Sequence, residues 1–344
     1  MKFVPHNYQR YCINRMITDP VLGLFLDMGL GKTVITLTAV NDLRFNRFAV
    51  RKVLVIAPKK VAEDTWTRES QKWDHLKMLR VIPVLGSIKQ RIRAINTPGD
   101  IWVLSRDNVS WLVDYYKNDW PFDMVIIDEL SSFKSNKAKR FRKLKSVRSH
   151  IHRIVGLTGT PTPNGLEDLW AQIYLLDEGE RLGKTLTGYR DNYFTPGARN
   201  GNVIYEYNPR TWADEEINER IKDICISMKA EDYLELPERI DNVRHIKLPD
   251  KAKKQYEELE KTMIADIDGE TIDVTSAAAL SNKLLQLCNG AVYDADGIYH
   301  EVHDEKIEAL KEIIDANAGK GILVFYNFKH DKARIQKALK KSKL

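Results

Sequence analysis

The feature that most constrains the fold of this 344-residue chain is a series of short apolar runs, each of which ends abruptly in polar or small residues. The runs are continuous rather than alternating, which is typical of strands buried on both faces, and the stretches between them are long enough for crossover helices. The pattern therefore predicts an α/β fold built on a parallel sheet. The predicted strands are LGLFLD (22–27), VLVIAPK (53–59), IWVLS (101–105), MVIIDE (124–129), IVGLTGT (154–160) and ILVFYN (322–327).

A glycine-rich turn follows the first run, in LDMGLGKTVITLTAV (26–40). Ligands of parallel sheets bind beyond the carboxyl ends of the strands, and a turn of this kind before a helix closes backbone N–H groups around phosphates. Lys32 would reach the β and γ phosphates and Thr33 would bind magnesium. The strict phosphate-loop pattern asks for glycine where Leu26 stands, so a plain helix cap is the alternative, which the flanking strand and helix disfavour.

Two further strand ends carry polar residues. Asp128 and Glu129 follow MVII, where an aspartate can hold magnesium and a glutamate can orient and deprotonate a water. Thr158, Gly159 and Thr160 follow the run at 154, where they would relay the state of the γ phosphate to another surface. Taken by itself, the last segment is more typical of a plain strand-to-helix turn.

In this order, the three segments resemble the superfamily two helicases, and specifically the Swi/Snf-type ATPases of phages and prophages. DMGLGKT resembles motif I of that branch, which also lacks the first glycine, DE resembles motif II, and LTGTPTPN resembles motif III. PHNYQRYCINRM (5–16) resembles the glutamine motif, VLVIAPKKVAEDTWTRE (53–69) motif Ia, and ILVFYNF (322–328) motif IV. The resemblance implies a RecA-like phosphate-loop lobe that hydrolyses ATP with Mg²⁺ to move along double-stranded DNA.

The same resemblance assigns roles to individual residues. Asp128, Glu129 and Lys32 would be catalytic, Thr33 and Asp128 would hold the metal, and Thr158, Gly159 and Thr160 would couple hydrolysis to motion. Nucleic acid would contact Lys59 and Lys60 after one strand and Ser105 and Arg106 after another. Trp66, in the motif Ia helix, is expected to pack in the core rather than stack on a base. ATP itself would contact Gln9, Met28, Gly29, Leu30, Gly31, Lys32, Thr33 and Val34.

The sequence departs from the family pattern in two places. Motif II reads DELS, so Ser131 stands where a histidine usually couples hydrolysis to motif III. Motifs V and VI, the second of which carries the arginine fingers, would follow residue 344. We therefore expect a truncated chain that binds ATP but turns it over poorly, since such an arginine is worth about 10³ to 10⁵ in rate in related chemistry.

The chain is expected to comprise a first lobe (1–177), a helical insertion or connector (178–240), and an incomplete second RecA-like lobe (241–344). The connector would either clamp DNA or recruit a protein partner. No apolar run reaches the ~20 residues of a membrane helix, and the start lacks a signal peptide. We therefore expect a cytoplasmic protein without membrane contact, associated with the nucleoid of a bacterial or phage-infected cell. Its three cysteines are expected to be buried thiols.

The net charge of +6 is local, because residues 134–153 hold nine Lys or Arg and no acidic residue. These cations are expected either to contact DNA or to form the solvated face of a helix, and the sequence leaves this open. Two alternatives to a duplex-DNA motor also stay open. One is a nucleotide-dependent protein-assembly switch that binds no nucleic acid, and the other is a helicase that unwinds RNA or single strands.

Overall fold

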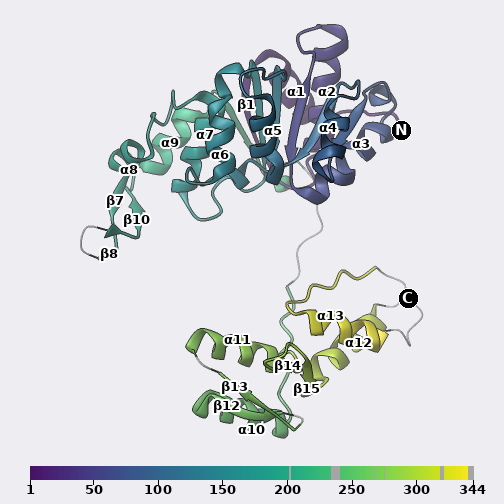
Figure 1. Cartoon of the computed structure of the whole chain (residues 1–344), viewed down its shortest axis with the longest axis vertical. Coiled ribbons are helices and arrows are strands. Elements are labelled where there is room, and N and C mark those ends of the chain that lie inside the picture. Colours follow the sequence, from purple (N-terminus) through teal and green to yellow (C-terminus); the bar gives the residue numbers. More distant parts are fainter. Residues whose placement is uncertain (201–202, 234–240, 268, 275, 318–320, 340–344) are drawn as a thin grey trace. The chain divides into compact units, whose positions relative to one another are not determined.

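The computed structural model describes residues 1–200, 203–233, 241–267, 269–274, 276–317 and 321–339 (Figure 1). The chain divides into two compact units, Met1–Pro237 and Glu238–Leu344. We describe each unit by itself.

The first unit is built on a seven-stranded sheet whose neighbouring strands all run parallel. The predicted α/β class is therefore confirmed. Across the sheet the strands are ordered β11 (Cys225–Met228), β1 (Val21–Leu26), β6 (Arg153–Thr158), β5 (Met124–Asp128), β2 (Val53–Ala57), β4 (Ile101–Ser105) and β3 (Val81–Val84).

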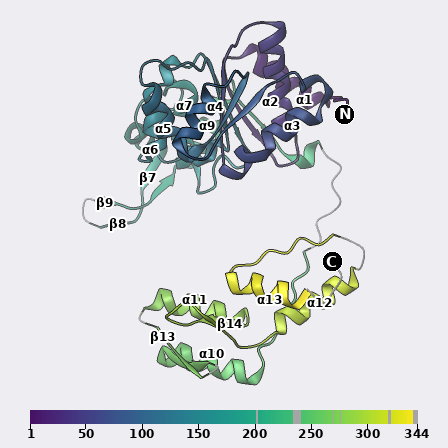
Figure 2. The same ribbon diagram turned by 45° about the vertical axis from the view of Figure 1, so that its right-hand side comes forward.

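Helices cover both faces of this sheet (Figures 1 and 2). In β2, Val53 and Val55 pack into one apolar core while Leu54 and Ile56 pack into the other. This two-sided burial is why the strands read as continuous apolar runs. One face is covered by α1 (Asn7–Thr18), α2 (Lys32–Asn41) and α3 (Trp66–Lys72), and the other by α4 (Ile88–Ile95), α5 (Val109–Tyr116), α6 (Lys139–Ser146), α7 (Leu169–Asp177), α8 (Leu186–Tyr193) and α9 (Ala213–Ile221).

Five of the six predicted strands are present, and the sheet contains two that the sequence did not reveal, β3 and β11. β3 is short and only partly buried, and β11 lies in the segment assigned to the connector. Because β11 pairs with β1, the first unit runs to Pro237, and the predicted lobe boundary at residue 177 was too early.

The prediction that residues 178–240 form a helical connector also needs correction. Besides α8 and the predicted charged helix α9, they form two antiparallel strand pairs. These hairpin strands lie beyond α8 at one side of the unit in Figure 1. The last residues of the predicted connector, 234–240, lie outside the described residues. The hairpin strands are β7 (Phe194–Pro196), β8 (Arg199–Asn200), β9 (Val203–Ile204) and β10 (Tyr207–Pro209).

The described residues of the second unit form four helices, which are α10 (Asp250–Thr262), α11 (Ala277–Cys288), α12 (Glu305–Ala316) and α13 (Lys329–Leu339). Two hairpins accompany them, β12 (Ile264–Ile267) with β13 (Glu270–Asp273), and β14 (Ala291–Tyr293) with β15 (Tyr299–Glu301). The predicted strand at 322–327 was wrong. Those residues are irregular, with Leu323 80% and Phe325 86% exposed. No described strand pairs with them, and an unpaired strand has no ladder to hold it.

None of the described helices is long and apolar enough to cross a membrane. All three cysteines are free thiols. Cys12 is buried, whereas Cys225 and Cys288 are only partly buried, which corrects the expectation that all three would be buried.

Candidate active site

The order of the strands brings the sequence motifs together at one edge of the sheet. β6 lies between β1 and β5, and β2 and β4 follow on the far side of β5. Because all of these strands are parallel, the residues after each one meet at the carboxyl edge. The glycine-rich turn, the threonines of β6 and the acidic pair of β5 are therefore neighbours, with the loops after β2 and β4 further along.

The turn between β1 and α2 has the backbone of a phosphate cradle. Gly29 and Gly31 have φ of +88° and +80°, in the left-handed region that favours glycine. A Cβ at Gly31 would lie only 2.8 Å from Nε2 of Gln9. α2 begins at Lys32, so the unpaired N–H groups of its first turn lie next to this cradle.

The ammonium group of Lys32 folds onto the turn itself. Its Nζ donates to the carbonyl oxygens of Leu26 at 2.6 Å and Asp27 at 3.2 Å. Burial lowers the pKa of Lys32, although the charges of Asp128, Glu129 and Asp27 oppose that shift. The negative charges of the same three carboxylates stabilise the Lys32 ammonium group. Lys32 therefore interacts electrostatically with the acidic pair as well as with the turn.

Gln9 joins α1 to the turn. Its Oε1 accepts the backbone N–H of His6 at 3.0 Å, and its Nε2 donates to the carbonyl oxygen of Leu30 at 3.3 Å. An amide can accept twice at oxygen and donate twice from nitrogen, so each atom keeps one further bond for a ligand. Tyr8 supports the same carbonyl of Leu30 through its hydroxyl, at 3.3 Å.

A cleft of about 780 Å³ lies over the turn. Seven of the eight residues predicted to contact ATP line it. The exception is Leu30, whose side chain is fully buried and which offers only its carbonyl to Tyr8 and Gln9. The lining residues are Met1, Lys2, Phe3, Val4, His6, Gln9, Met28, Gly29, Gly31, Lys32, Thr33, Val34, Thr65, Glu69, Lys72 and Trp73.

Asp128, the last residue of β5, is held by a residue from another element. Nε1 of Trp66 donates to its Oδ2 at 2.9 Å. Burial raises the pKa of Asp128, and the charge of Glu129 adds to the rise, while the Trp66 bond and the charge of Lys32 oppose it. Trp66 is fully buried, so the expectation that it packs in the core is confirmed.

Two hydroxyl groups hold the carboxylate of Glu129. The Ser131 hydroxyl and the Thr158 hydroxyl both donate to Oε1, the latter at 3.0 Å. Oγ1 of Thr158 also accepts the backbone N–H of Thr160 at 3.2 Å. Glu129 has φ of +63°, which is uncommon for a residue other than glycine. Ser131, in the histidine position, thus binds Glu129 within motif II, whereas Thr158 joins motif III to motif II. Among the described residues, Oε2 of Glu129 is left for a further partner.

Gly159 lies against the phosphate turn. A Cβ at Gly159 would come 3.3 Å from the carbonyl oxygen of Leu26 and 3.7 Å from Nζ of Lys32. The residues predicted to couple hydrolysis to motion therefore contact both the acidic pair, through Thr158, and the cradle, through Gly159.

These residues fit a magnesium nucleotide. Magnesium prefers oxygen ligands and binds through one or two carboxylates together with phosphate oxygens. Thr33 supplies a hydroxyl, Asp128 a carboxylate, and the glycine cradle would accept the phosphates. Among the described residues no group of three or more His, Cys, Asp or Glu could by itself hold a metal.

The predicted nucleic-acid contacts differ in accessibility. Lys59 and Lys60 follow β2 and are exposed, and Arg106 follows β4 and is partly exposed. Ser105 is only 3% exposed, and its hydroxyl donates to Asp107 at 3.4 Å. Its side chain is not presented for a nucleic-acid contact.

Most of the basic stretch 134–153 is engaged within the protein. Arg148 is buried and donates to backbone carbonyls at the end of α7, and Arg153 donates to the carbonyls that end α1. Lys134 and Lys143 pair with carboxylates, Arg140 donates to the carbonyl of Ser132, and Lys145 lies over the ring of Tyr174. Within the described part of the chain, the exposed cations of this stretch without a hydrogen-bond, ion-pair or ring partner are Lys137, Lys139 and Arg142.

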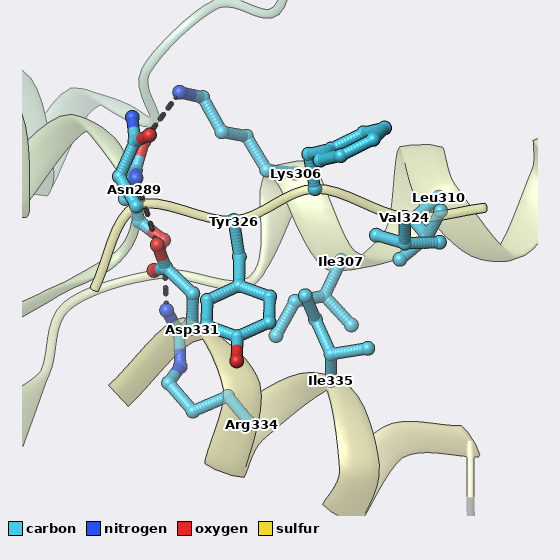
Figure 3. A pocket seen from close by; sticks show the side chains of 11 residues that line it. Asn289, Lys306, Ile307, Leu310, Val324, Tyr326, Asp331, Arg334 and Ile335 are labelled. Carbon is cyan, nitrogen blue, oxygen red and sulfur yellow. Dashed lines mark hydrogen bonds between the residues drawn. The ribbon is translucent and has the colours of Figure 1, made fainter. Parts of the chain in front are cut away.

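The second unit has a separate cavity of about 340 Å³ (Figure 3). Its polar residues mostly bond one another. Asn289 accepts from Lys306 and donates to Asp331, and Arg334 donates to the carbonyl of Asn289. The remaining lining is largely apolar, so this cavity offers no acid–base pair comparable to that of the first unit.

Sequence reasoning missed several participants in the site. Phe3, Lys72 and Trp73 line the cleft, and Trp66 binds Asp128 through a group that the apolar pattern does not report. The departure at Ser131 was visible in the sequence, but its hydrogen bond to Glu129 was not. The backbone N–H of Ala230, just after β11, donates to Asp27 of the turn at 2.9 Å, a contact between residues far apart in the chain.

Comparisons with known proteins identify the family. The model of the SNF2-related domain family matches residues 8–291. The chain is 37% identical to putative protein p41 of Acyrthosiphon pisum secondary endosymbiont phage 1, over 99% of this chain and 76% of that protein. It is 23% identical to helicase swr1 of Aspergillus fumigatus, over 82% of this chain but only 17% of that protein.

A solved structure has a similar fold. It is the Sulfolobus solfataricus SWI2/SNF2 ATPase core in complex with double-stranded DNA, with a TM-score of 0.57 and 22% identity, over 99% of this chain and 71% of that chain.

Proposed function

This chain belongs to the SNF2-related family, and from that premise we propose that it binds and hydrolyses ATP to move along double-stranded DNA. The observation that carries the proposal is the convergence, at one edge of the sheet, of the glycine cradle with Lys32, the pair Asp128 and Glu129, and the hydroxyl of Thr158. A cradle, a cation and a positioned carboxylate are the parts that phosphoryl transfer to water requires.

Each residue has a role in the proposed reaction. The cradle N–H groups and Lys32 bind the phosphates. Gln9 makes its remaining hydrogen bonds, one at Oε1 and one at Nε2, to the adenine base. Thr33 and Asp128 would hold magnesium, which neutralises charge that develops on the phosphate oxygens. Glu129, whose Oε1 is held by two hydroxyls, would orient the attacking water at Oε2 and take its proton.

The choice of duplex DNA as the track rests on relatives and on accessible cations. The Sulfolobus core is described in complex with double-stranded DNA, and the Aspergillus relative swr1 is named a helicase. Lys59, Lys60 and Arg106 are accessible at the same edge of the sheet as the acidic pair, where they would contact phosphates without reading bases. A protein partner at residues 178–240, poor turnover by this chain and nucleoid association stay predictions.

The test is nucleotide binding and ATP hydrolysis by the full chain, with and without nucleic acid. We expect Lys32→Ala to abolish ATP binding, because it removes the phosphate cation. Glu129→Gln should bind ATP normally and lose residual hydrolysis. Lys222→Ala, at an exposed lysine that pairs with Glu219 on α9, is the matched control and should behave as wild type.

Comparison of nucleic acids decides the track. Duplex DNA should bind and stimulate hydrolysis more than single strands or RNA, and its binding should weaken steeply between low and moderate salt because several phosphate contacts release counterions. Stronger stimulation by RNA or single strands would favour an unwinding helicase. Nucleotide binding with no response to any nucleic acid would instead favour the protein-assembly switch.

A further inference from the structure

Trp66 connects two parts of the proposed motor that the sequence keeps apart. Its indole N–H donates to Oδ2 of Asp128 at 2.9 Å, and its side chain is fully buried. The bond engages Oδ2 of Asp128, so Oδ1 is the oxygen that remains for a metal ion. A donor fixed on one oxygen orients the carboxylate, as hydrogen bonds to metal-binding side chains commonly do.

The backbone that carries Trp66 also carries the exposed lysines after β2. Residues 59–72 form one uninterrupted helical stretch, in which Lys59 and Lys60 lie in the first turn and Trp66 begins α3. Between them runs the π-helix η2 (Val61–Thr65). π-Helical turns are rare and are frequent at functional sites. A displacement of the lysines would therefore be transmitted along the helix to Trp66 rather than absorbed by a flexible loop.

The two ends of this helix differ in their surroundings. The Lys59 side chain is 73% exposed, and among the described residues its ion-pair partner is Glu63, at 4.0 Å. Trp66 packs into the same apolar core as Leu30 of the phosphate turn and Val34 of α2. One end is thus free to contact a polyanion, while the other is fixed between the nucleotide cradle and the acidic pair.

From this arrangement we propose that Trp66 is a positioning residue that links DNA binding at Lys59 and Lys60 to magnesium binding at Asp128. The proposal rests on the proposed function and adds a route within it. Duplex DNA on the lysines stabilises the helix position in which the indole N–H reaches Oδ2. That position orients Asp128, so DNA strengthens the binding of magnesium with nucleotide. By linkage, magnesium with nucleotide strengthens the binding of DNA by the same factor.

The experiment titrates Mg²⁺ into the full chain with a fluorescent, non-hydrolysable ATP analogue, with and without a short DNA duplex of mixed sequence. For wild type we expect the duplex to strengthen apparent Mg²⁺ affinity by about 5-fold or more, the lower end of ordinary coupling. Trp66→Phe keeps an aromatic ring in the core and removes the indole N–H together with its five-membered ring. It should weaken Mg²⁺ binding by about 10-fold and lose the duplex effect, with analogue affinity in EDTA unchanged.

The matched control is Trp102→Phe. Trp102 is also buried in the first unit, and its indole N–H donates to the carbonyl of Ala94 at 3.2 Å, away from the acidic pair. This variant loses a similar bond and should keep both the Mg²⁺ affinity and the duplex effect. Equal losses in both tryptophan variants would assign the effect to weakened packing and overturn the proposal.

The double variant Lys59→Gln, Lys60→Gln tests the DNA-binding end of the helical stretch 59–72. Its result stays informative even if Trp66→Phe fails to fold. It should keep wild-type Mg²⁺ affinity without DNA and lose the duplex effect. A duplex effect that survives in either this variant or Trp66→Phe overturns the proposed route, as does a wild type that binds analogue and duplex without coupling. A wild type that binds neither ligand would instead defeat the proposed function.

Discussion

At the scale of single residues, hydrogen bonds from other elements hold the two carboxylates that we propose to be catalytic. Asp128 and Glu129 are adjacent in sequence, yet different elements hold them. Trp66 of α3 binds the first, and Ser131 with Thr158 of β6 binds the second. Each carboxylate of the acidic pair is therefore held by a different part of the fold.

We predict that Ser131→Ala slows hydrolysis without weakening nucleotide binding. The change removes one of two donors to Oε1 of Glu129, and a bond worth about 1.4 kcal/mol in the transition state corresponds to a 10-fold fall in kcat. Single-turnover kinetics with a parallel binding titration measure the two effects. Ser132→Ala is the control, because its buried hydroxyl has no hydrogen-bond partner among the described residues. Unchanged kcat in Ser131→Ala would remove the serine from the proposed mechanism.

We also predict that Gly31→Ala abolishes tight ATP binding and destabilises the first unit by about 1–2 kcal/mol. Its φ is +80°, and the added Cβ would lie 2.8 Å from Nε2 of Gln9. Gly183→Ala separates the two causes, because Gly183 has φ of +90° but no atom within 4 Å of an added Cβ. Thermal unfolding should show destabilisation in both variants, whereas a binding titration should show loss of ATP in Gly31→Ala alone.

At the scale of elements, buried charges join segments whose apolar patterns are weak. Asp100 stands just before β4 and is 1% exposed. It accepts from Nε of Arg44 and from the backbone and side chain of Arg80, which directly precedes the edge strand β3. A strand too short to be recognised from its sequence is thus attached to the sheet by a carboxylate.

Asp100→Asn should destabilise the first unit by about 2 kcal/mol near neutral pH. Burial raises the pKa of Asp100, but the hydrogen bonds and charge of Arg80, with a bond from Arg44, outweigh burial and hold the pKa below its usual value. A lowered native pKa adds stability above the unfolded value of about 3.9, and this stability is lost as pH falls through the native value. Denaturant unfolding at pH 7 and near pH 3 should show the difference from wild type shrinking in acid.

The cations of the basic stretch 134–153 should differ in role, since some hold the fold together and others are exposed. Arg148→Met should destabilise the first unit by about 3 kcal/mol, because it leaves buried carbonyls of α7 unpaired. The triple variant Lys137→Gln, Lys139→Gln, Arg142→Gln should change stability by less than about 0.5 kcal/mol. If these three residues touch DNA, the variant should also flatten the salt dependence of duplex binding. An unchanged salt slope would identify them as a solvated face.

At the scale of the whole molecule, the chain folds as two units, and the cleft over the glycine-rich turn belongs to the first. We predict two unfolding transitions in calorimetry. A non-hydrolysable ATP analogue should raise the midpoint temperature of one of them. At 100 times its dissociation constant, the analogue should add about 2.7 kcal/mol to the unit that binds it. The shift should vanish in Lys32→Ala. One transition that moves as a whole would show that the two units unfold cooperatively.

The whole molecule also explains which expectations about fold held. Five strands and the α/β class were predictable because burial on both faces produces continuous apolar runs. The run at 322–327 has the same apolar pattern, but it pairs with no described strand and is irregular. An apolar pattern alone does not tell whether a neighbouring strand is present. β11 was missed for the opposite reason, since four residues in a polar region become a strand only because β1 offers an edge.

The sequence by itself determined the parallel α/β class, the residues of the phosphate turn and acidic pair, and the family resemblance, because these depend on local spacing and on the polarity of strand ends. Only the tertiary structure decided how those residues are held. It placed Trp66 on Asp128 and two hydroxyls on Glu129, removed the side chains of Leu30 and Ser105 from the accessible surface, and engaged most of the basic stretch internally. The physical reason is that hydrogen bonds and burial depend on which strand ends become neighbours, and strand order leaves no mark on local sequence.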